Sequence, residues 1–258
     1  MRYRACLLPL LTAAGFLAGC ETNKKPDALE AGRSAMMRRD YATATTNLDA
    51  YLKAQPNGPR SAEAFYLKGH ALQDSPSEDF GEAMGKLQEA RVAYIDALKV
   101  GTDSRGLEGL IRASLADVAF WQEDYAVAAE QGRAAYPLLE DPNVRAMALY
   151  RSGLSYQRLG KFEDGDRTLK LVVQYHPGTQ PAARAQQRIG IRSFSVKIPQ
   201  SSPTSLSSAM ATLTRQGYAP ATVPGESAIN LGPYKTYPEA NAVRGKIVSQ
   251  YPKATVVP

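Results

Sequence analysis

Apolar and small residues recur at helical spacing through most of the chain and then give way to short alternating runs. Between residues 28 and 192 they return every three or four positions with few strand-like stretches, which predicts a succession of amphipathic helices. From residue 194 onward the short runs are "FSVKI", "APATV", "AINL" and "ATVV", which are typical of strands. The pattern therefore predicts two domains: an all-α domain over 28–192 and a small α+β domain over 193–258.

The helical part repeats one spacing of small and large residues. Two copies place apolar or small residues at +12, +16 and +19 from a glycine: Gly32, Ala44, Leu48 and Tyr51, then Gly153, Gly165, Leu169 and Val172. A third copy runs from Ala116 through Ala128. A unit starting at Gly69 fits if two extra residues are allowed, and it then reaches Ala83, Leu87 and Ala90.

This spacing resembles the tetratricopeptide repeat, a helix-turn-helix of about 34 residues. The best copies are "YRSGLSYQRLGKFEDGDRTLKLVVQYHPG" and "AGRSAMMRRDYATATTNLDAYLKAQPNG", and "PAARAQQRIG" follows as a capping helix. The resemblance implies a solenoid whose first helices line a groove for a peptide or a partner protein. The groove candidates, each of which has an ordinary packing role as its alternative, are Tyr66, His70, Asp117, Tyr150 and Arg158. Trp121 is expected in the core.

The C-terminal part reads as strand, helix, strand, strand, helix, strand. Pro203 begins the first helix and Gly217 ends it, while Thr236 and Glu239 form a capping box at the start of the second. This order predicts a split βαβ, ferredoxin-like sandwich.

Its motifs resemble the sporulation-related repeat (SPOR) domain. They are "FSVKI", a helix ending in "LTRQGY", then "AINLGPYKTYPEANAVRGKI" and "ATVV". The resemblance implies an envelope module that binds peptidoglycan glycan strands, often at division sites. Lys197, Pro199 and Ala228 depart from the family pattern, so the choice between stripped and intact glycan stays open.

Alternation along these strands predicts which side chains point away from the helices. With Val196, Ile229, Leu231 and Val256 inward, the open sheet face carries the glycan-binding candidates Ser195, Lys197, Thr222, Asn230 and Thr255. A merely solvated face is the alternative. The two central strands offer no outward aromatic residue for base stacking, so no nucleic-acid partner is expected. A glycosidase needs two placed carboxylates, and the module has only Glu226 and Glu239, so the chain is not expected to be an enzyme.

The N-terminus, "MRYRACLLPLLTAAGFLAGC", has two arginines, an apolar stretch and small residues before Cys20. This is the build of a secretory signal, and its apolar stretch is shorter than the roughly 20 residues of a membrane span. Leu17 to Cys20 resembles the bacterial lipobox, which implies a signal peptide over 1–19, lipidation of Cys20 and a tether over 20–27. By the same resemblance Glu21 favours the periplasmic face of the outer membrane.

The distribution of charge and of cysteine and histidine residues limits which partners and cofactors are expected. Of the net charge of +6, residues 194–258 hold six cations against two anions, which places attraction to an anionic polymer in this part. The other cysteine, Cys6, lies in the signal, and the two histidines, His70 and His176, are far apart, so no metal or cofactor is expected. The sequence predicts a lipid-anchored, non-enzymatic envelope protein that binds peptidoglycan and a partner protein. The alternative is an assembly scaffold or pilot lipoprotein of an outer-membrane machine, with both modules binding protein.

Overall fold

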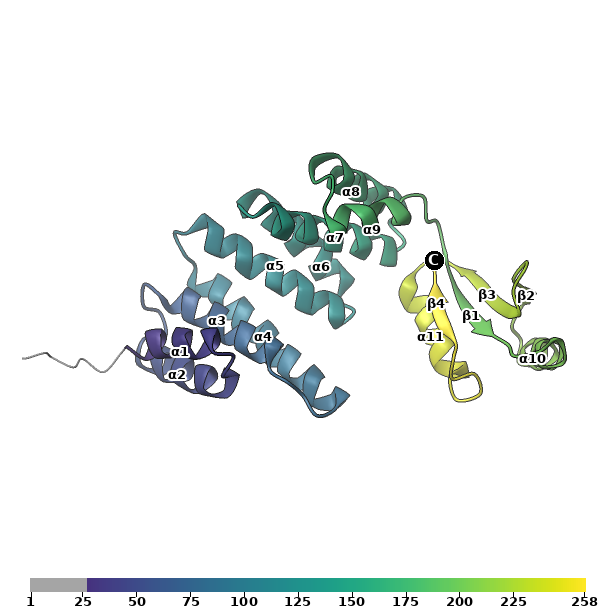
Figure 1. Ribbon diagram of the computed structural model, residues 1–258, viewed down its shortest axis with the longest axis horizontal. Helices are drawn as coiled ribbons and strands as arrows, with labels where there is room; N and C mark the ends of the chain where they lie inside the picture. Colours follow the sequence, from purple (N-terminus) through teal and green to yellow (C-terminus); the bar gives the residue numbers. More distant parts are fainter. Residues whose placement is uncertain (1–26) are drawn as a thin grey trace, which may run out of the picture.

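The computed structural model describes residues 27–258, which form a row of stacked helices followed by a small sheet with two helices (Figure 1). The predicted signal peptide and Cys20 lie outside the described residues. The elements of the helical part are α1 (Ala28–Met37), α2 (Tyr41–Ala54), α3 (Ser61–Asp74), α4 (Phe80–Val100), α5 (Arg105–Trp121), α6 (Tyr125–Ala135), the 3₁₀ turn η1 (Tyr136–Leu138), α7 (Pro142–Arg158), α8 (Phe162–Tyr175) and α9 (Gln180–Arg188). The later elements are β1 (Phe194–Pro199), α10 (Pro203–Arg215), β2 (Pro220–Thr222), β3 (Ala228–Tyr234), α11 (Tyr237–Ile247) and β4 (Thr255–Val257).

Side-chain caps start most of the repeat helices. Just before each of these helices an Asp, Ser or Thr side chain accepts a backbone N–H from the first turn, which is then not left unpaired. These capping residues are Asp27, Asp40, Asp79, Ser104, Asp124, Asp141 and Thr179. Successive helices pack on one another from α1 through α9, so the helical part is a solenoid of four helix pairs with α9 at its end. None of the described helices combines the length and apolar character needed to cross a membrane.

Glycines at the predicted positions let paired helices approach closely. A Cβ on Gly32 would lie 2.8 Å from Leu48 Cγ, and a Cβ on Gly153 would lie 2.8 Å from Leu169 Cδ2. Both leucines are fully buried. The predicted spacing of +16 between glycine and leucine is therefore confirmed in the first and last helix pairs.

The second helix pair departs from the predicted spacing. A Cβ on Gly69 would meet the ring of Tyr94, 2.5 Å from its Cε1, and the fully buried residues of α4 are Ala90, Tyr94 and Ala97. The predicted set, Ala83, Leu87 and Ala90, lies seven residues too early. Helix α4 has 21 residues, and seven residues are about two turns, which return to the same helix face. Periodicity alone therefore could not separate the two registers.

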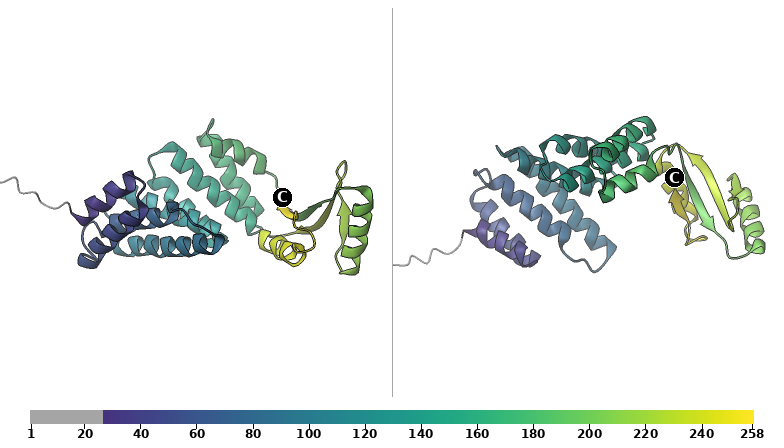
Figure 2. Two further views of the ribbon diagram at one scale, coloured as in Figure 1. Left: turned by 60° about the horizontal axis from the view of Figure 1, so that its bottom comes forward. Right: turned by 45° about the horizontal axis from the view of Figure 1, so that its top comes forward.

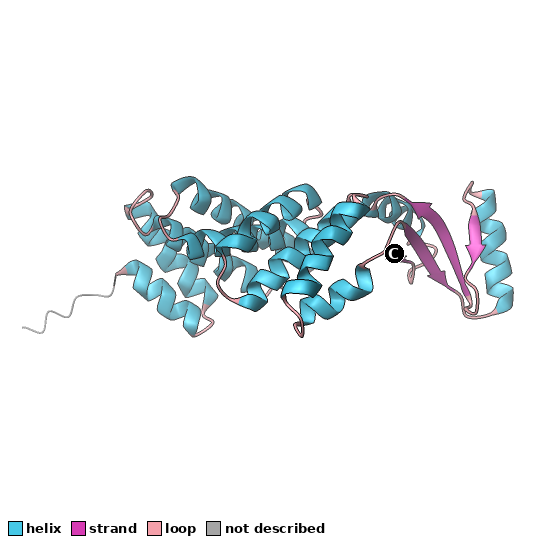
Figure 3. Ribbon diagram, turned by 90° about the horizontal axis from the view of Figure 1, so that it is seen from above, coloured by secondary structure: helices cyan, strands magenta, loops and turns pink. Residues whose placement is uncertain are grey.

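The C-terminal part has the predicted order of elements and forms one four-stranded antiparallel sheet, β2-β3-β1-β4. Figure 3 shows strands at this end of the molecule, in magenta, beyond the stacked helices. Pairing of Val196 with Leu231 and of Ile198 with Ile229 aligns the buried side chains of the two central strands. Helices α10 and α11 pack their buried residues, Leu213 among them, against this inner face. The predicted capping box of Thr236 and Glu239 is confirmed.

The two parts touch through an aromatic junction. Helix α11 lies on the solenoid side of the sheet, with α10 farther away (Figures 1 and 2). The Tyr237 ring is 6.0 Å from that of Tyr125 and 5.8 Å from that of Phe194, centroid to centroid. Asn241 Nδ2 donates to Glu123 Oε1 at 3.2 Å. Side chains from both parts therefore bury one another where the chain passes from α9 to β1.

Candidate functional site

Alternate helices of the solenoid line one hollow, here called the first-helix groove. It has a volume of about 350 Å³, and its walls come from α3, α5 and α7, the first helices of three successive pairs. Their contributions are Tyr66, His70, Gln73, Leu110, Ala113, Ser114, Asp117, Val144, Met147, Ala148 and Arg151. The residues of α7 that line the groove are at positions 144, 147, 148 and 151, and this spacing places them on a single helix face.

A polar network crosses the floor of this groove. Arg151 of α7 forms an ion pair with Asp117 of α5, and Gln73 Nε2 of α3 donates to Asp117 Oδ2 at 3.3 Å. Tyr94 in turn donates its hydroxyl to Gln73 Oε1 at 2.9 Å. These bonds join three helix pairs, so the groove has a fixed arrangement of acceptors and donors between apolar walls.

One end of the groove is aromatic. The ring of Tyr66 lies 5.0 Å from that of His70 in an edge-to-face contact. Burial raises the pKa of the Tyr66 hydroxyl, with the charge of Asp74 as a second cause. The phenol therefore stays protonated at neutral pH and keeps an O–H to donate to a ligand.

Three of the five predicted groove residues come together. Tyr66, His70 and Asp117 line the first-helix groove. Tyr150 does not: its side chain is buried in the core between the last helix pairs, because it lies about 100° around α7 from Arg151. Its placement in the groove was wrong. Arg158 lies two turns beyond Arg151, outside the groove and against the C-terminal part.

Arginines and aromatic rings extend the same face of α7. The Arg151 guanidinium carbon is 4.4 Å from the centre of the Phe120 ring and 5.5 Å from that of Trp121. Trp121 is 58% exposed, so its predicted place in the core was wrong. As the last residue of α5, it has no following turn of its own helix to cover it. Sequence patterns missed Arg151, which lines the groove with the other unpredicted residues of α3, α5 and α7, and they missed that Trp121 packs on Arg151 at the surface.

The open face of the C-terminal sheet collects four of its five candidates. Asn230 of β3, Lys197 of β1 and Thr255 of β4 lie opposite one another across three strands, and Ser195 lies two residues from Lys197 on the same face. The Asn230 side chain has a buried Oδ1 with no hydrogen-bond partner in the described residues. This face therefore carries hydroxyls and a lysine around one acceptor that is itself buried and unpaired.

Two features of that face differ from expectation. Thr222 pairs with Ile229, whose side chain points toward the helices, so the placement of Thr222 on the open face was wrong; Ala221 lies there instead, opposite Asn230. Strand β2 has only three residues, too few for alternation to define its faces. Lys197 forms an ion pair with Glu226 from the β2–β3 turn, so the face is less cationic than expected.

Within residues 27–258 no three His, Cys, Asp or Glu side chains gather as a metal site would require. Among the residues that line the groove, Asp117 is the one carboxylate, and it is paired with Arg151, so no two carboxylates face this hollow.

Comparison with known families identifies the solenoid unit. A family model described as the tetratricopeptide repeat matches residues 147–179, which span most of α7 and all of α8. This chain contains a tetratricopeptide repeat. The matched segment supplies Met147, Ala148 and Arg151 to the groove. Tetratricopeptide repeats are generally non-enzymatic scaffolds for protein–protein interaction, and the match suggests that role for this chain.

A solved structure described as the crystal structure of MamA protein superposes with a TM-score of 0.49 at 19% sequence identity, covering 76% of this chain and 96% of the other. A search of curated protein sequences found no match.

Proposed function

We propose that this protein is an envelope scaffold that binds a segment of a partner protein in its first-helix groove. The observation that carries the proposal is the joining of Tyr66, Asp117 and Arg151 from three successive first helices around one hollow of about 350 Å³. Aromatic and arginine anchors in a partly desolvated groove are the residues that dominate protein interfaces. Apolar walls with a few fixed polar groups suit a short peptide segment.

Replacement of groove residues tests this proposal. A photo-crosslinking amino acid at Ala113 in cells should capture a partner, while the same group at Lys170, an exposed α8 residue outside the groove, should not. Purified chain should then bind that partner at least about tenfold more weakly after Val144→Glu or Tyr66→Ala, since a lost anchor costs about 1.4 kcal/mol or more. Asn143→Glu, an exposed neighbour outside the groove, is the matched control and should bind as the wild type does. Equal binding by all three variants would reject the groove.

We further propose that the C-terminal part is a SPOR-like module that binds peptidoglycan glycan strands through its open sheet face. The supporting observation is the unpartnered Oδ1 of Asn230 beside Ser195, Lys197 and Thr255. A buried acceptor without a partner is costly, so rotation of the half-buried Asn230 amide toward the open face is favoured when a sugar hydroxyl or an acetamido N–H donates to it there. Envelope functions such as cell division follow from this proposal, and a second protein-binding role for the module is its alternative.

Pelleting with purified sacculi tests the glycan proposal. Asn230→Ala should reduce the bound fraction severalfold at unchanged melting temperature, because the side chain contributes an acceptor and not core packing. Lys246→Ala, an exposed residue of α11, removes a charge away from this face and should leave pelleting unchanged. Amidase-treated sacculi compared with untreated ones would separate stripped from intact glycan. If the wild type pellets with neither kind of sacculus, the glycan proposal is rejected and the alternative, in which both modules bind protein, takes its place.

Lipidation of Cys20 and attachment to the periplasmic face of the outer membrane complete the proposal. Metabolic labelling with an acyl analogue should mark the wild type and not Cys20→Ser, which should also remain uncleaved. A Cys20→Ser protein that is processed and fractionates with membranes as the wild type does would contradict the anchor.

A further inference from the structure

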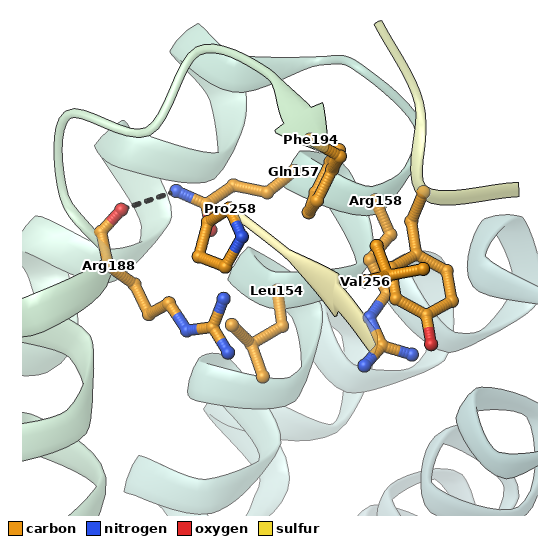
Figure 4. A pocket seen from close by; sticks show the side chains of 8 residues that line it. Leu154, Gln157, Arg158, Arg188, Phe194, Val256 and Pro258 are labelled. Carbon is orange, nitrogen blue, oxygen red and sulfur yellow. Dashed lines mark hydrogen bonds between the residues drawn. The ribbon is translucent and has the colours of Figure 1, made fainter. Parts of the chain in front are cut away.

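The junction between the two parts encloses a cavity of about 120 Å³ (Figure 4). Leu154 and Arg158 enter it from α7, Arg188 comes from the end of α9, and Phe194 and Val256 come from the sheet. Pro258, which follows β4, also lines the cavity, and within the described residues its carboxylate forms no ion pair with either arginine. Sites for drug-sized ligands measure about 300–1,000 Å³. This cavity therefore has room for one side chain or a group of similar size.

Two arginines in the cavity lack a carboxylate partner. In the described part of the chain neither Arg158 nor Arg188 forms an ion pair, although seven other arginines do. In Figure 4 their side chains lie on either side of Leu154. Among the described residues Arg158 donates only to the Tyr125 hydroxyl, at 2.8 Å, and its guanidinium carbon lies 4.1 Å from the centre of the Tyr237 ring. Its position is thus held by a hydrogen bond and ring contacts, with no ion pair among the described residues.

Two acidic side chains of the junction have other partners. Asp166 accepts hydrogen bonds from the Gly190 N–H and from Arg192, and Glu123 accepts from Asn241. Gln157, which also lines the cavity, donates its amide to the Arg188 carbonyl at 2.7 Å and to Asp166 at 3.3 Å. The donors left over in the cavity belong to the two guanidinium groups, and such planar forks pair best with carboxylates or phosphates.

The cavity also continues the face that carries the first-helix groove. Arg158 lies seven residues after Arg151 on α7, about two turns and about 10 Å along the helix. An extended peptide covers that distance with about three residues. A segment bound in the groove therefore reaches the cavity with a side chain a few residues further along.

We propose that this cavity binds a glutamate or aspartate side chain of the partner segment, which makes the partner an acidic peptide. The proposal rests on the proposed function for the identity of the partner as a peptide in the first-helix groove. It adds a second anchor, formed jointly by the repeats and the C-terminal part, with carboxylate as the recognised group.

Titration with two probes tests the cavity in the full chain. The first is succinate, and the second is an acetylated Ala-Leu-Ala-Glu-Glu-Ala peptide with its Gln-Gln counterpart. Succinate and the Glu peptide should shift the side-chain Nε–Hε signals of Arg158 and Arg188 in NMR spectra. Arg188→Gln should weaken the binding of succinate and of the Glu peptide at least tenfold. The Gln-Gln peptide should bind the wild type at least tenfold more weakly than the Glu peptide does.

Arg184→Gln is the matched control. It removes the same charge from an exposed position one turn earlier on α9, outside the cavity, and should change either affinity less than twofold. The proposal is overturned if Arg188→Gln binds both probes as the wild type does, or if Glu and Gln peptides bind alike. It is also overturned if Arg188→Gln binds both probes normally and loses only its pelleting with amidase-treated sacculi, because the cavity would then bind glycan and not a carboxylate side chain. Inorganic phosphate that competes equally with succinate, without any Glu-peptide binding, would also overturn it.

Two variants distinguish a failure of the cavity proposal from a failure of the first-helix groove proposal. Val144→Glu should weaken binding of the crosslinked partner and leave the succinate shifts of Arg158 and Arg188 intact. Loss of partner binding in Arg188→Gln with retained binding in Val144→Glu would reject the groove and keep the cavity.

Discussion

Gly153→Arg is expected to lower the stability of the solenoid more than any other single change considered. A Cβ at this position would lie 2.8 Å from both Leu169 Cγ and Cδ2, and 3.4 Å from the Gly165 carbonyl oxygen. Leu169 is fully buried, so it cannot move into solvent. Overpacking costs about 1–3 kcal/mol or more, and an unpaired buried charge adds several kcal/mol. We expect a loss of at least about 3 kcal/mol, measured as a lower urea midpoint by circular dichroism.

Gly85→Arg is the matched control for this change. Gly85 lies on α4, and a Cβ there would have no neighbour within 4 Å. The same substitution should therefore leave the urea midpoint nearly unchanged. If the two variants unfold at the same midpoint, the close approach of α7 and α8 at Gly153 is refuted.

Ile229→Ala is expected to unfold the C-terminal part while the repeats stay folded. Ile229 is fully buried in the core between the sheet and its two helices. Removal of a buried isoleucine side chain costs about 2–5 kcal/mol, and a module of about 65 residues has only about 3–5 kcal/mol of its own. NMR spectra should lose the dispersed signals of residues 194–258 and keep those of the helical part.

The neighbouring residue provides the control for strand parity. Asn230→Ala changes a side chain on the opposite face of the same strand and should leave these signals dispersed. Val196→Ala, which truncates another fully buried residue, should act in the same direction as Ile229→Ala. If Asn230→Ala unfolds the module and Ile229→Ala does not, the inward and outward faces have been exchanged.

Much of the architecture could be predicted because it depends on local spacing. The +16 step from Gly32 to Leu48 recurs from Gly153 to Leu169 because both pairs face one another across a short turn. The order of the C-terminal elements and the box of Thr236 and Glu239 follow from caps, turns and alternation over a few residues. Such signals are contained within single elements or between adjacent ones, so they can be read without a structure.

The functional surfaces depend on rotations and registers that local patterns leave undetermined. Tyr150 and Arg151 are adjacent in sequence, yet about 100° of helix rotation puts one in the core and the other in the groove. In the three-residue strand β2, a shift of one position moved Thr222 to the other face. The extra length of α4 could not be located, because insertion of about two turns leaves the apolar face unchanged.

By itself the sequence determined the two-part architecture, the repeat unit with its glycine contacts, the element order of the C-terminal part and three residues of the groove. Only the tertiary structure decided which charges remain uncompensated and which residues join the two parts. Lys197 pairs with Glu226, 29 positions away, while Arg158 packs on Tyr237, 79 positions away, and forms no ion pair in the described part of the chain. Periodicity reports which face of an element is buried. The partner of a charged side chain depends on which elements the whole fold brings together, and residue spacing along the chain does not determine which distant elements become neighbours.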